Sequence, residues 1–250
     1  MAPTRLADVR VHWLPVDRLL DRAYDVWPWL SIVERRRTVS FHSEGERKRY
    51  VIAHAFMRGV LSAYLGSDPR EIEIHHTPVG RPVIAKPWPA IGFSLSRCET
   101  HAAVAVAPVT QVGVDIECCG RAIDCIGVAR AFFNNMEIEF LAALPPSECE
   151  VQFLRLWTCK EAFAKAIGLG LRYPLDRFAI RGVQSLKPEL EMLDREAHTG
   201  DEWSLDMREL KTGCYAAVAA PRTAGHQIQW NESAKHVPVT FRDARCARLR

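Results

Sequence analysis

The stretch VGVDIE at residues 112–117 alternates apolar and polar residues, which predicts a β-strand. Because successive side chains of a strand point to opposite faces, its three branched apolar residues are expected to enter the core. Asp115 and Glu117 then project together from the other face. Adjacent carboxylates repel each other unless a cation or water separates them, and such oxygen ligands suit Mg²⁺. For this stretch taken alone, a strand with a polar outer face is the simpler interpretation.

A second informative stretch is WTCKEAFAKAIGLG at residues 157–170. Trp157, Glu161 and Lys165 follow one another at intervals of four, so a helix would place them on one stripe. Gly168 and Gly170 supply a helix stop with a permissive backbone. Taken alone, this pattern is more typical of an exposed Glu–Lys pair worth ~0.2–0.5 kcal/mol, with a packed tryptophan, than of a catalytic helix.

The rest of the chain predicts a mixed fold. The first third is interpreted as helical and basic, with an amphipathic helix over 43–64 that begins at a Ser43–Glu46 capping pattern and ends before Gly66. Helical patterns return over 121–168. Period-two or short apolar stretches, expected to be strands, lie at 71–76, 91–96, 101–107, 111–117, 175–181, 203–209, 214–220 and 226–241.

The order of helix, strands, helices and strands predicts an α+β protein built as two similar halves. A weak internal sequence similarity supports two halves, because HAAVAVAPVT at 101–110 resembles YAAVAAPRT at 215–223. We place the boundary near residue 110. The predicted subdomains are therefore 1–110, for nucleotide contacts, and 111–250, for the carboxylates and the second long helix.

Composition restricts the class of protein. The 250 residues are 48% hydrophobic and 25% charged, with a net charge of +3, which gives no bulk signal for nucleic-acid binding. No apolar run approaches the ~20 residues of a membrane span, and no secretory signal is seen. The eight cysteines include no C-x-x-C pair, so we expect eight reduced thiols in a cytoplasmic protein, with no zinc site.

Together, G-V-D-I-E and W-T-x-K-E-A-x-x-K-x-x-G-x-G-L resemble the motifs of the 4′-phosphopantetheinyl transferases, specifically the larger type that activates peptide and polyketide synthases. Gly80-Arg81-Pro82 resembles the family's G-K/R-P element, and Phe93-Ser94-Leu95-Ser96 resembles its F-x-x-S strand. The resemblance covers roughly residues 45–181. It implies a pseudo-dimer of two α+β subdomains, with coenzyme A in the cleft between them.

The resemblance also implies a reaction. Phosphopantetheine would move from coenzyme A to a serine hydroxyl of an apo acyl, peptidyl or aryl carrier protein or domain, with release of adenosine 3′,5′-bisphosphate. Asp115, Glu117 and Glu161 would hold Mg²⁺, with Mn²⁺ as an alternative ion. Glu161 and Lys165 would be catalytic, as the base for the serine and as the cation on the phosphates.

The family pattern further assigns a set of coenzyme A contacts. They comprise Arg49, Arg81, Ser96, Arg97, Lys160 and Lys165, with the Arg35–Arg37 run as a lesser contributor. Arg97 is a departure, because the family commonly has His after F-x-x-S; a guanidinium can still bind phosphate. His75-His76 is interpreted as a solvated pair, since neighbours on a strand face opposite ways.

The expected protein is a monomer that binds a carrier protein, and neither nucleic acid nor a membrane. Two alternatives stay open at this point. A Mg²⁺-dependent pyrophosphate hydrolase would use the same carboxylates with water, and would turn over coenzyme A without a carrier. A non-catalytic carrier-protein binder would have lost its chemistry at Arg97, although four intact candidate site residues argue against decay.

Overall fold

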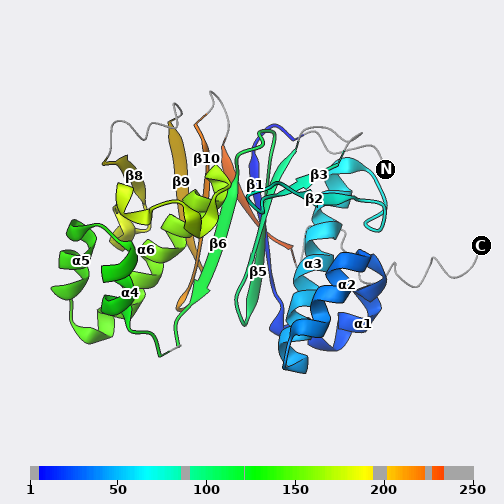
Figure 1. Cartoon of the computed structure of the whole chain (residues 1–250), viewed down its shortest axis with the longest axis horizontal. Coiled ribbons are helices and arrows are strands. Elements are labelled where there is room, and N and C mark those ends of the chain that lie inside the picture. The colour runs from blue at the N-terminus through cyan, green and yellow to red at the C-terminus, as the bar shows by residue number, and fades with distance from the viewer. Residues whose placement is uncertain (1–5, 86–90, 121, 194–201, 223–226, 234–250) are drawn as a thin grey trace, which may run out of the picture.

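Two β-sheets face each other in the middle of the molecule, and helices cover the outer face of each (Figure 1). The computed structural model describes residues 6–85, 91–120, 122–193, 202–222 and 227–233. A small apolar cluster joins the inner faces of the sheets. It consists of Val9, Val11, Ala103, Ala105, Ala107, Val112, Val114, Val218 and Ala220.

The first sheet has the strand order β11-β1-β5-β4. Its strands are β1 (Val9–Pro15), β4 (Gly92–Arg97), β5 (His101–Ala107) and β11 (Ile228–Glu232). The outer face packs against α3 (Glu44–Leu65), which begins where Ser43 accepts a hydrogen bond from the amide of Glu46 and ends at the left-handed Gly66. The helix predicted over 43–64 is thereby confirmed.

The second sheet has the order β6-β10-β9, all antiparallel. Its strands are β6 (Gly113–Cys118), β9 (Trp203–Lys211) and β10 (Cys214–Pro221), and α6 (Pro146–Ile167) covers its outer face. α6 ends at Gly168, whose φ of 92° is the left-handed conformation that glycine adopts without strain.

Shorter elements complete the described chain. The remaining α-helices and strands are α1 (Ala23–Val26), α2 (Ile32–Arg37), α4 (Cys125–Phe132), α5 (Asn135–Ala142), β2 (Ile74–His76), β3 (Pro82–Ile84), β7 (Phe178–Arg181) and β8 (Glu189–Met192). Short 3₁₀ turns lie at Asp17–Arg22, Trp27–Trp29, Thr38–Ser40, Gly170–Arg172, Leu175–Arg177 and Val183–Ser185.

The mixed content of helices and strands confirms the α+β class. The helical interpretation of the first third was wrong for β1, where Val9 and Val11 alternate with more polar residues as a buried strand requires. The predicted boundary near residue 110 falls in the connection between β5 and β6. β11 nevertheless returns from the C-terminal part to pair in parallel with β1 in the first sheet. Residues 234–241 of the last predicted strand lie outside the described residues.

The expectation of eight reduced thiols was also wrong. A disulfide joins Cys118 to Cys214, which are directly opposite each other on β6 and β10 with 4.0 Å between their Cα atoms. Spacing along the chain could not reveal this bond, because the two cysteines are 96 residues apart. The other described cysteines are free thiols, and Cys246 lies outside the described residues.

In the described part of the chain, every helix is too short or too polar to cross a bilayer.

Candidate active site

The site is built where α6 packs directly on β6. Gly113 makes this contact possible, because a Cβ placed there would lie 2.0 Å from the carbonyl oxygen of Ala162. Gly113 and Asp115 are two residues apart on one strand, so both face α6. The close approach therefore brings the Asp115 carboxylate to the last turns of the helix.

Asp115 is the centre of a polar cluster and is only 3% exposed. Its Oδ1 accepts hydrogen bonds from Lys165 Nζ at 2.6 Å and from Ser96 Oγ at 2.8 Å. Lys165 Nζ also lies 3.2 Å from Ser96 Oγ. A second serine of β4 anchors the strand, since Ser94 Oγ accepts a hydrogen bond from the amide of Val114. β4, β6 and α6 thus each supply one member of the cluster.

The other oxygen of this carboxylate, Oδ2, is buried and has no hydrogen-bond partner among the described residues. Leaving a carboxylate oxygen buried without a partner is costly, so such an atom usually has a ligand, an ion or water in the functional state. Carboxylate oxygens are the preferred protein ligands of Mg²⁺. The residues present therefore fit a divalent cation at Asp115.

Glu161 lies one helical turn before Lys165 on α6 and is 8% exposed. Burial and the nearby Asp115 carboxylate raise the pKa of Glu161, while Lys165 opposes the shift. Burial lowers the pKa of Lys165, but the negative charges of Asp115, Glu161 and Glu117 outweigh it, so this pKa is raised. Three carboxylates therefore act on a single ammonium group. This excess of negative charge is what a cation site requires.

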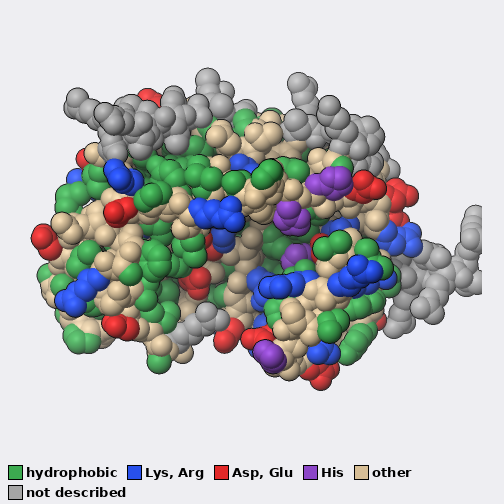
Figure 2. Space-filling model, in the orientation of Figure 1, with side chains coloured by type: hydrophobic (Ala, Val, Ile, Leu, Met, Phe, Trp, Pro, Cys, Tyr) green, Lys and Arg blue, Asp and Glu red, His purple; other side chains and the backbone are tan. Residues whose placement is uncertain are grey.

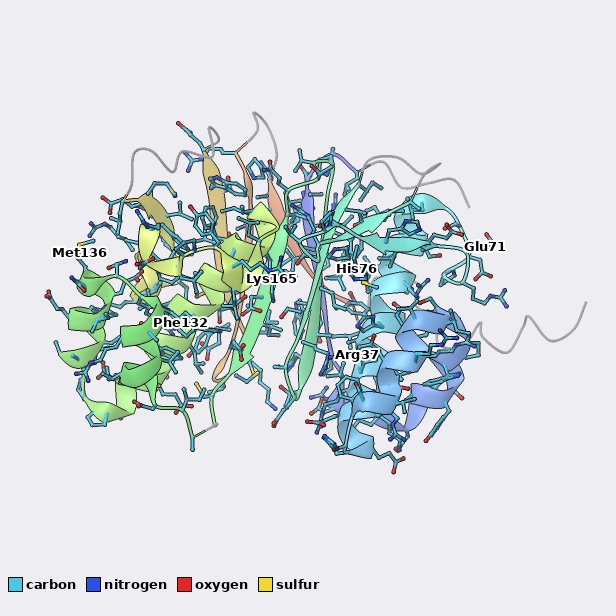
Figure 3. The ribbon with its side chains drawn as sticks, in the orientation of Figure 1. Arg37, Glu71, His76, Phe132, Met136 and Lys165 are labelled. Carbon is cyan, nitrogen blue, oxygen red and sulfur yellow. A yellow bond between two sulfur atoms is a disulfide. The ribbon has the colours of Figure 1, made fainter. Side chains whose placement is uncertain are left out.

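A pocket of about 850 Å³ opens beside Lys165. It lies between α3, the β2–β3 hairpin and the end of α6, and Figure 2 shows a hollow at the centre of this face, bordered by basic and histidine side chains. Figure 3 shows Lys165, His76 and Arg37 around it, from α6, β2 and α2. A volume of this size accommodates a nucleotide-sized ligand.

Arg81 lines this pocket and also ties the two halves together. Its guanidinium donates hydrogen bonds to the carbonyl oxygens of Ala166 at 3.0 Å and of Thr110. Gly168 leaves space for it, since a Cβ there would lie 3.1 Å from Nη1 of Arg81. In the structure, Arg81 thus positions the C-terminal end of α6 at the pocket wall.

Arg49 and Arg97 lie farther along α3 and β4 and do not line this pocket. The guanidinium of Arg97 stands 5.6 Å from the ring centre of Phe41 and 5.8 Å from that of Tyr50. Burial lowers the pKa of Arg97, and the nearby positive charge of Arg49 adds to the shift. Nε of Arg49 has no hydrogen-bond partner among the described residues. Two adjacent guanidinium groups therefore form a positive surface next to Tyr50, which does line the pocket.

Lys160 is the predicted site residue that the structure places elsewhere. Its side chain is 0% exposed and points away from Asp115, into the core between α5, α6 and β7. Nζ pairs with Glu137 at 2.8 Å and donates to the carbonyl oxygens of Leu175 and Phe178 at 2.7 and 2.8 Å. With its three protons engaged inside the protein, this ammonium cannot bind coenzyme A, and the expectation is corrected.

Sequence reasoning missed several pocket residues. His54 and Tyr50 of α3 line the pocket, and Arg37, considered only a lesser contributor, lines it too. His75 and His76 are both exposed, as expected of a solvated pair, yet both border the pocket. These residues come from three separate segments with no shared spacing. Only the tertiary structure could assemble them.

Comparison with known proteins identifies the family. The family model of the 4′-phosphopantetheinyl transferase superfamily matches residues 111–216, which include β6 and α6. The transferase HetI of Nostoc sp. is 30% identical over 219 residues, spanning 86% of this chain and 89% of its own. The chain belongs to the 4′-phosphopantetheinyl transferase superfamily. The resemblance inferred from the motifs is thus confirmed, and the chain is an enzyme of this superfamily.

Two further relatives come from a mammal and from another bacterium. The human L-aminoadipate-semialdehyde dehydrogenase-phosphopantetheinyl transferase is 26% identical over 212 residues, covering 78% of this chain and 68% of its own. The 4′-phosphopantetheinyl transferase of Bacillus subtilis is 30% identical over 152 residues, covering 61% and 66%. Both relatives are thus named as phosphopantetheinyl transferases.

Proposed function

We propose that this transferase moves the 4′-phosphopantetheine group of coenzyme A to a serine hydroxyl of an apo carrier protein, with Mg²⁺ as its metal. The observation that carries the proposal is the unpartnered Oδ2 of Asp115, next to Glu161 and to Lys165, which lines the 850 Å³ pocket. Binding pocket, cation ligands and a fixed positive charge then meet at one point. Phosphoryl transfer requires this combination.

Asp115, Glu117 and Glu161 are the proposed ligands of the metal, which when bound neutralises charge on the pyrophosphate oxygens. Asp115 is already oriented for this role, because Lys165 and Ser96 hold its Oδ1. Mn²⁺ would fit the same oxygen ligands. The two ions differ in how strongly each is held, which a titration of activity against each ion measures.

In the proposed reaction, the serine oxygen of the carrier forms a bond to the phosphorus that bears the pantetheine arm. The bond from this phosphorus to the bridging oxygen of the pyrophosphate breaks, and adenosine 3′,5′-bisphosphate leaves. Glu161 accepts the serine proton, a role that the raised pKa of its carboxylate suits. Lys165 offsets the charge that develops on the leaving phosphate.

The pocket is the proposed site of coenzyme A. Arg37, His54 and Arg81 line it from three elements, so phosphate groups would meet positive or protonatable side chains from several sides. Arg49 and Arg97 extend this positive surface beside Tyr50. We propose Arg97 as a phosphate contact in place of the histidine that the family commonly has.

We also propose a pseudo-dimer within a monomeric chain, with subdomains of 1–110 and 111–250. Each half carries one 22-residue helix, α3 or α6, packed on the outer face of its sheet. The Ala/Val-rich strands β5 and β10, whose sequences are similar, each occupy an inner position in their sheet. β11 is the exchanged element that ties the C-terminal half to the first sheet.

The function is tested with a panel of purified apo carriers from fatty-acid, polyketide, peptide-synthetase and aminoadipate-reducing systems, each incubated with coenzyme A and Mg²⁺. Mass spectrometry should detect the added phosphopantetheine on at least one carrier, and chromatography should detect adenosine 3′,5′-bisphosphate in equal amount. Glu189→Gln, which changes an exposed carboxylate on β8, is the matched control for Asp115→Asn. Coenzyme A turnover without any carrier adduct would instead indicate a hydrolase.

A further inference from the structure

A cluster of sulfur and imidazole side chains lies outside the site described above. Cys98 and His101 flank the turn between β4 and β5, in the spacing Cys-x-x-His. Cys118 ends β6, and Cys214 begins β10 opposite it. Cys98 Sγ, Cys118 Sγ and a ring nitrogen of His101 all lie within 4.8 Å of one another. Three segments from both sheets therefore converge on one small volume.

The hydroxyl of Thr100 lies at the centre of this group. Its Oγ1 is 2.8 Å from Nδ1 of His101, 3.4 Å from Sγ of Cys118, and 3.7 Å from the Sγ atoms of both Cys98 and Cys214. Four atoms of the types that bind zinc thus surround this one hydroxyl, which must turn aside for a metal to take its place. Three thiolates and one imidazole form a common closed zinc site.

Hydrogen bonds within the turn hold Cys98 and His101 close to each other without a metal. The amide of Cys98 donates to the carbonyl of His101 at 2.9 Å, and the amide of His101 donates back to Cys98 Sγ at 3.4 Å. His101 is 4% exposed, so its ring is held in place by packing.

We propose that Cys98, His101, Cys118 and Cys214 bind one Zn²⁺ when the Cys118–Cys214 disulfide is reduced. The disulfide and the metal use the same sulfur atoms, so the two states exclude each other. Reduction by a dithiol supplies two electrons and two protons and yields two thiols. Zn²⁺ then displaces the protons of the three thiols, with no further change of oxidation state. The site joins the β4–β5 turn of the first sheet to β6 and β10 of the second.

Cobalt is the probe for this site, because Co²⁺ bound to thiolates absorbs in the near ultraviolet and Co²⁺ bound to carboxylates does not. The full chain is reduced, freed of reductant without air, and titrated with Co²⁺ in excess Mg²⁺, which occupies the carboxylates. We expect the thiolate band to saturate at about one Co²⁺ per chain and to be lost when Zn²⁺ is added. The oxidised protein should show no band.

Cys98→Ser is the test variant, and Cys149→Ser, a half-buried thiol on α6, is its matched control. Cys98→Ser should weaken metal binding more than about 100-fold, because losing even the partner of a ligand costs 10–100-fold. Cys149→Ser should bind as the wild type does. If Cys98→Ser fails to fold, as judged by circular dichroism, His101→Gln takes its place.

Two results would overturn the proposal. The first is a reduced wild-type protein that shows no thiolate band, whether or not it takes up Co²⁺ elsewhere. The second is an equal affinity for Co²⁺, measured at the thiolate band, in the wild type and in the folded Cys98→Ser or His101→Gln variant. Neither result depends on transferase activity, so the proposed function stands or falls separately.

Discussion

Lys160 and Lys165 are five residues apart on the same helix, and each pairs with a buried carboxylate, yet their surroundings differ. Lys160 is fully enclosed, and the Glu137 carboxylate that it contacts also accepts a hydrogen bond from the amide of Ile180. Lys165 keeps 29% of its side chain exposed at the pocket. Its partner Asp115 has one oxygen with no hydrogen bond.

The difference distinguishes a closed ion pair from an open one. In a closed pair, every proton and lone pair is engaged inside the protein, and the pair fixes the packing of its elements. In an open pair, an oxygen and a charge are left for a ligand, which is the arrangement of a reactive site. Arg58 and Glu34 form another buried pair, in the first half, with 2.7 Å between Nε and Oε2, and both residues also line the pocket.

Removing the carboxylate of the open pair should have the largest effect. Asp115→Ala removes the ligand oxygen and the partner of Lys165, and we expect kcat for carrier modification to fall at least about 10⁴-fold, more than ~5 kcal/mol. The chain should still fold, because Asp115 contributes no apolar packing. The measurement is carrier modification followed by mass spectrometry, with circular dichroism as the control. Turnover like that of the wild type in the folded variant would remove the metal hypothesis.

The two lysines provide the direct test of the comparison. Lys160→Met leaves Glu137 buried without its partner, so the free energy of unfolding should fall by about 3–5 kcal/mol. Lys165→Met leaves Asp115 buried without its ammonium partner, so it should also lower stability, but it should in addition reduce the transfer rate, which Lys160→Met should not. Urea unfolding and kcat of both variants separate the roles. A transfer rate reduced equally in the two folded variants would contradict the division into closed and open pairs.

The buried Arg58–Glu34 pair of the first half predicts an acid sensitivity. Burial raises the pKa of Glu34, but hydrogen bonding to His54 and the charge of Arg58 outweigh it and lower this pKa to about 2 from 4.5. A lowered carboxylate pKa stabilises the fold fully above pH 4.5, and the contribution disappears as the pH falls through 2. The full contribution is about 3 kcal/mol, of which about 2 kcal/mol should be lost by pH 3.

Urea unfolding of the wild type and of Glu34→Gln between pH 6 and pH 3 measures this contribution. The wild type should lose stability more steeply than the variant, which has no carboxyl at that position to protonate. Parallel pH dependence in the two proteins would show that Glu34 does not carry the effect.

The smallest expected effect concerns the surface beside the pocket. Arg97→Ala should weaken coenzyme A binding by roughly 1.5–3 kcal/mol, the range for a hydrogen bond to a charged group. Arg97→His should recover part of this loss, more at pH 6 than at pH 8, because imidazole is charged mainly below its ordinary pKa near ~6.5. Calorimetric titration at both pH values compares the three proteins. Three equal affinities would mean that the phosphate contact at this position is absent.

Local patterns were sufficient for the elements of the site. Period-two alternation around Asp115 predicted β6, and intervals of four around Glu161 predicted the last turns of α6. The same patterns could not separate Lys160 from Lys165, because both residues fit a helix and both fit a family motif. Which lysine meets the pocket depends on how α6 is rotated against β6, and Gly113 sets that rotation through a long-range contact.

The sequence by itself determined the family and the α+β class, and it singled out Asp115, Glu117 and Glu161 as candidate metal ligands, because these inferences depend on residue type and on spacing within one strand or one helix. Tertiary structure alone decided the unpartnered oxygen of Asp115, the pocket beside Lys165, the return of β11 to the first sheet and the Cys118–Cys214 bond. Each of these joins residues distant in the chain. Their proximity follows from packing, which selects one arrangement of the strands and helices. Such long-range contacts produce no periodic pattern of residues in the sequence.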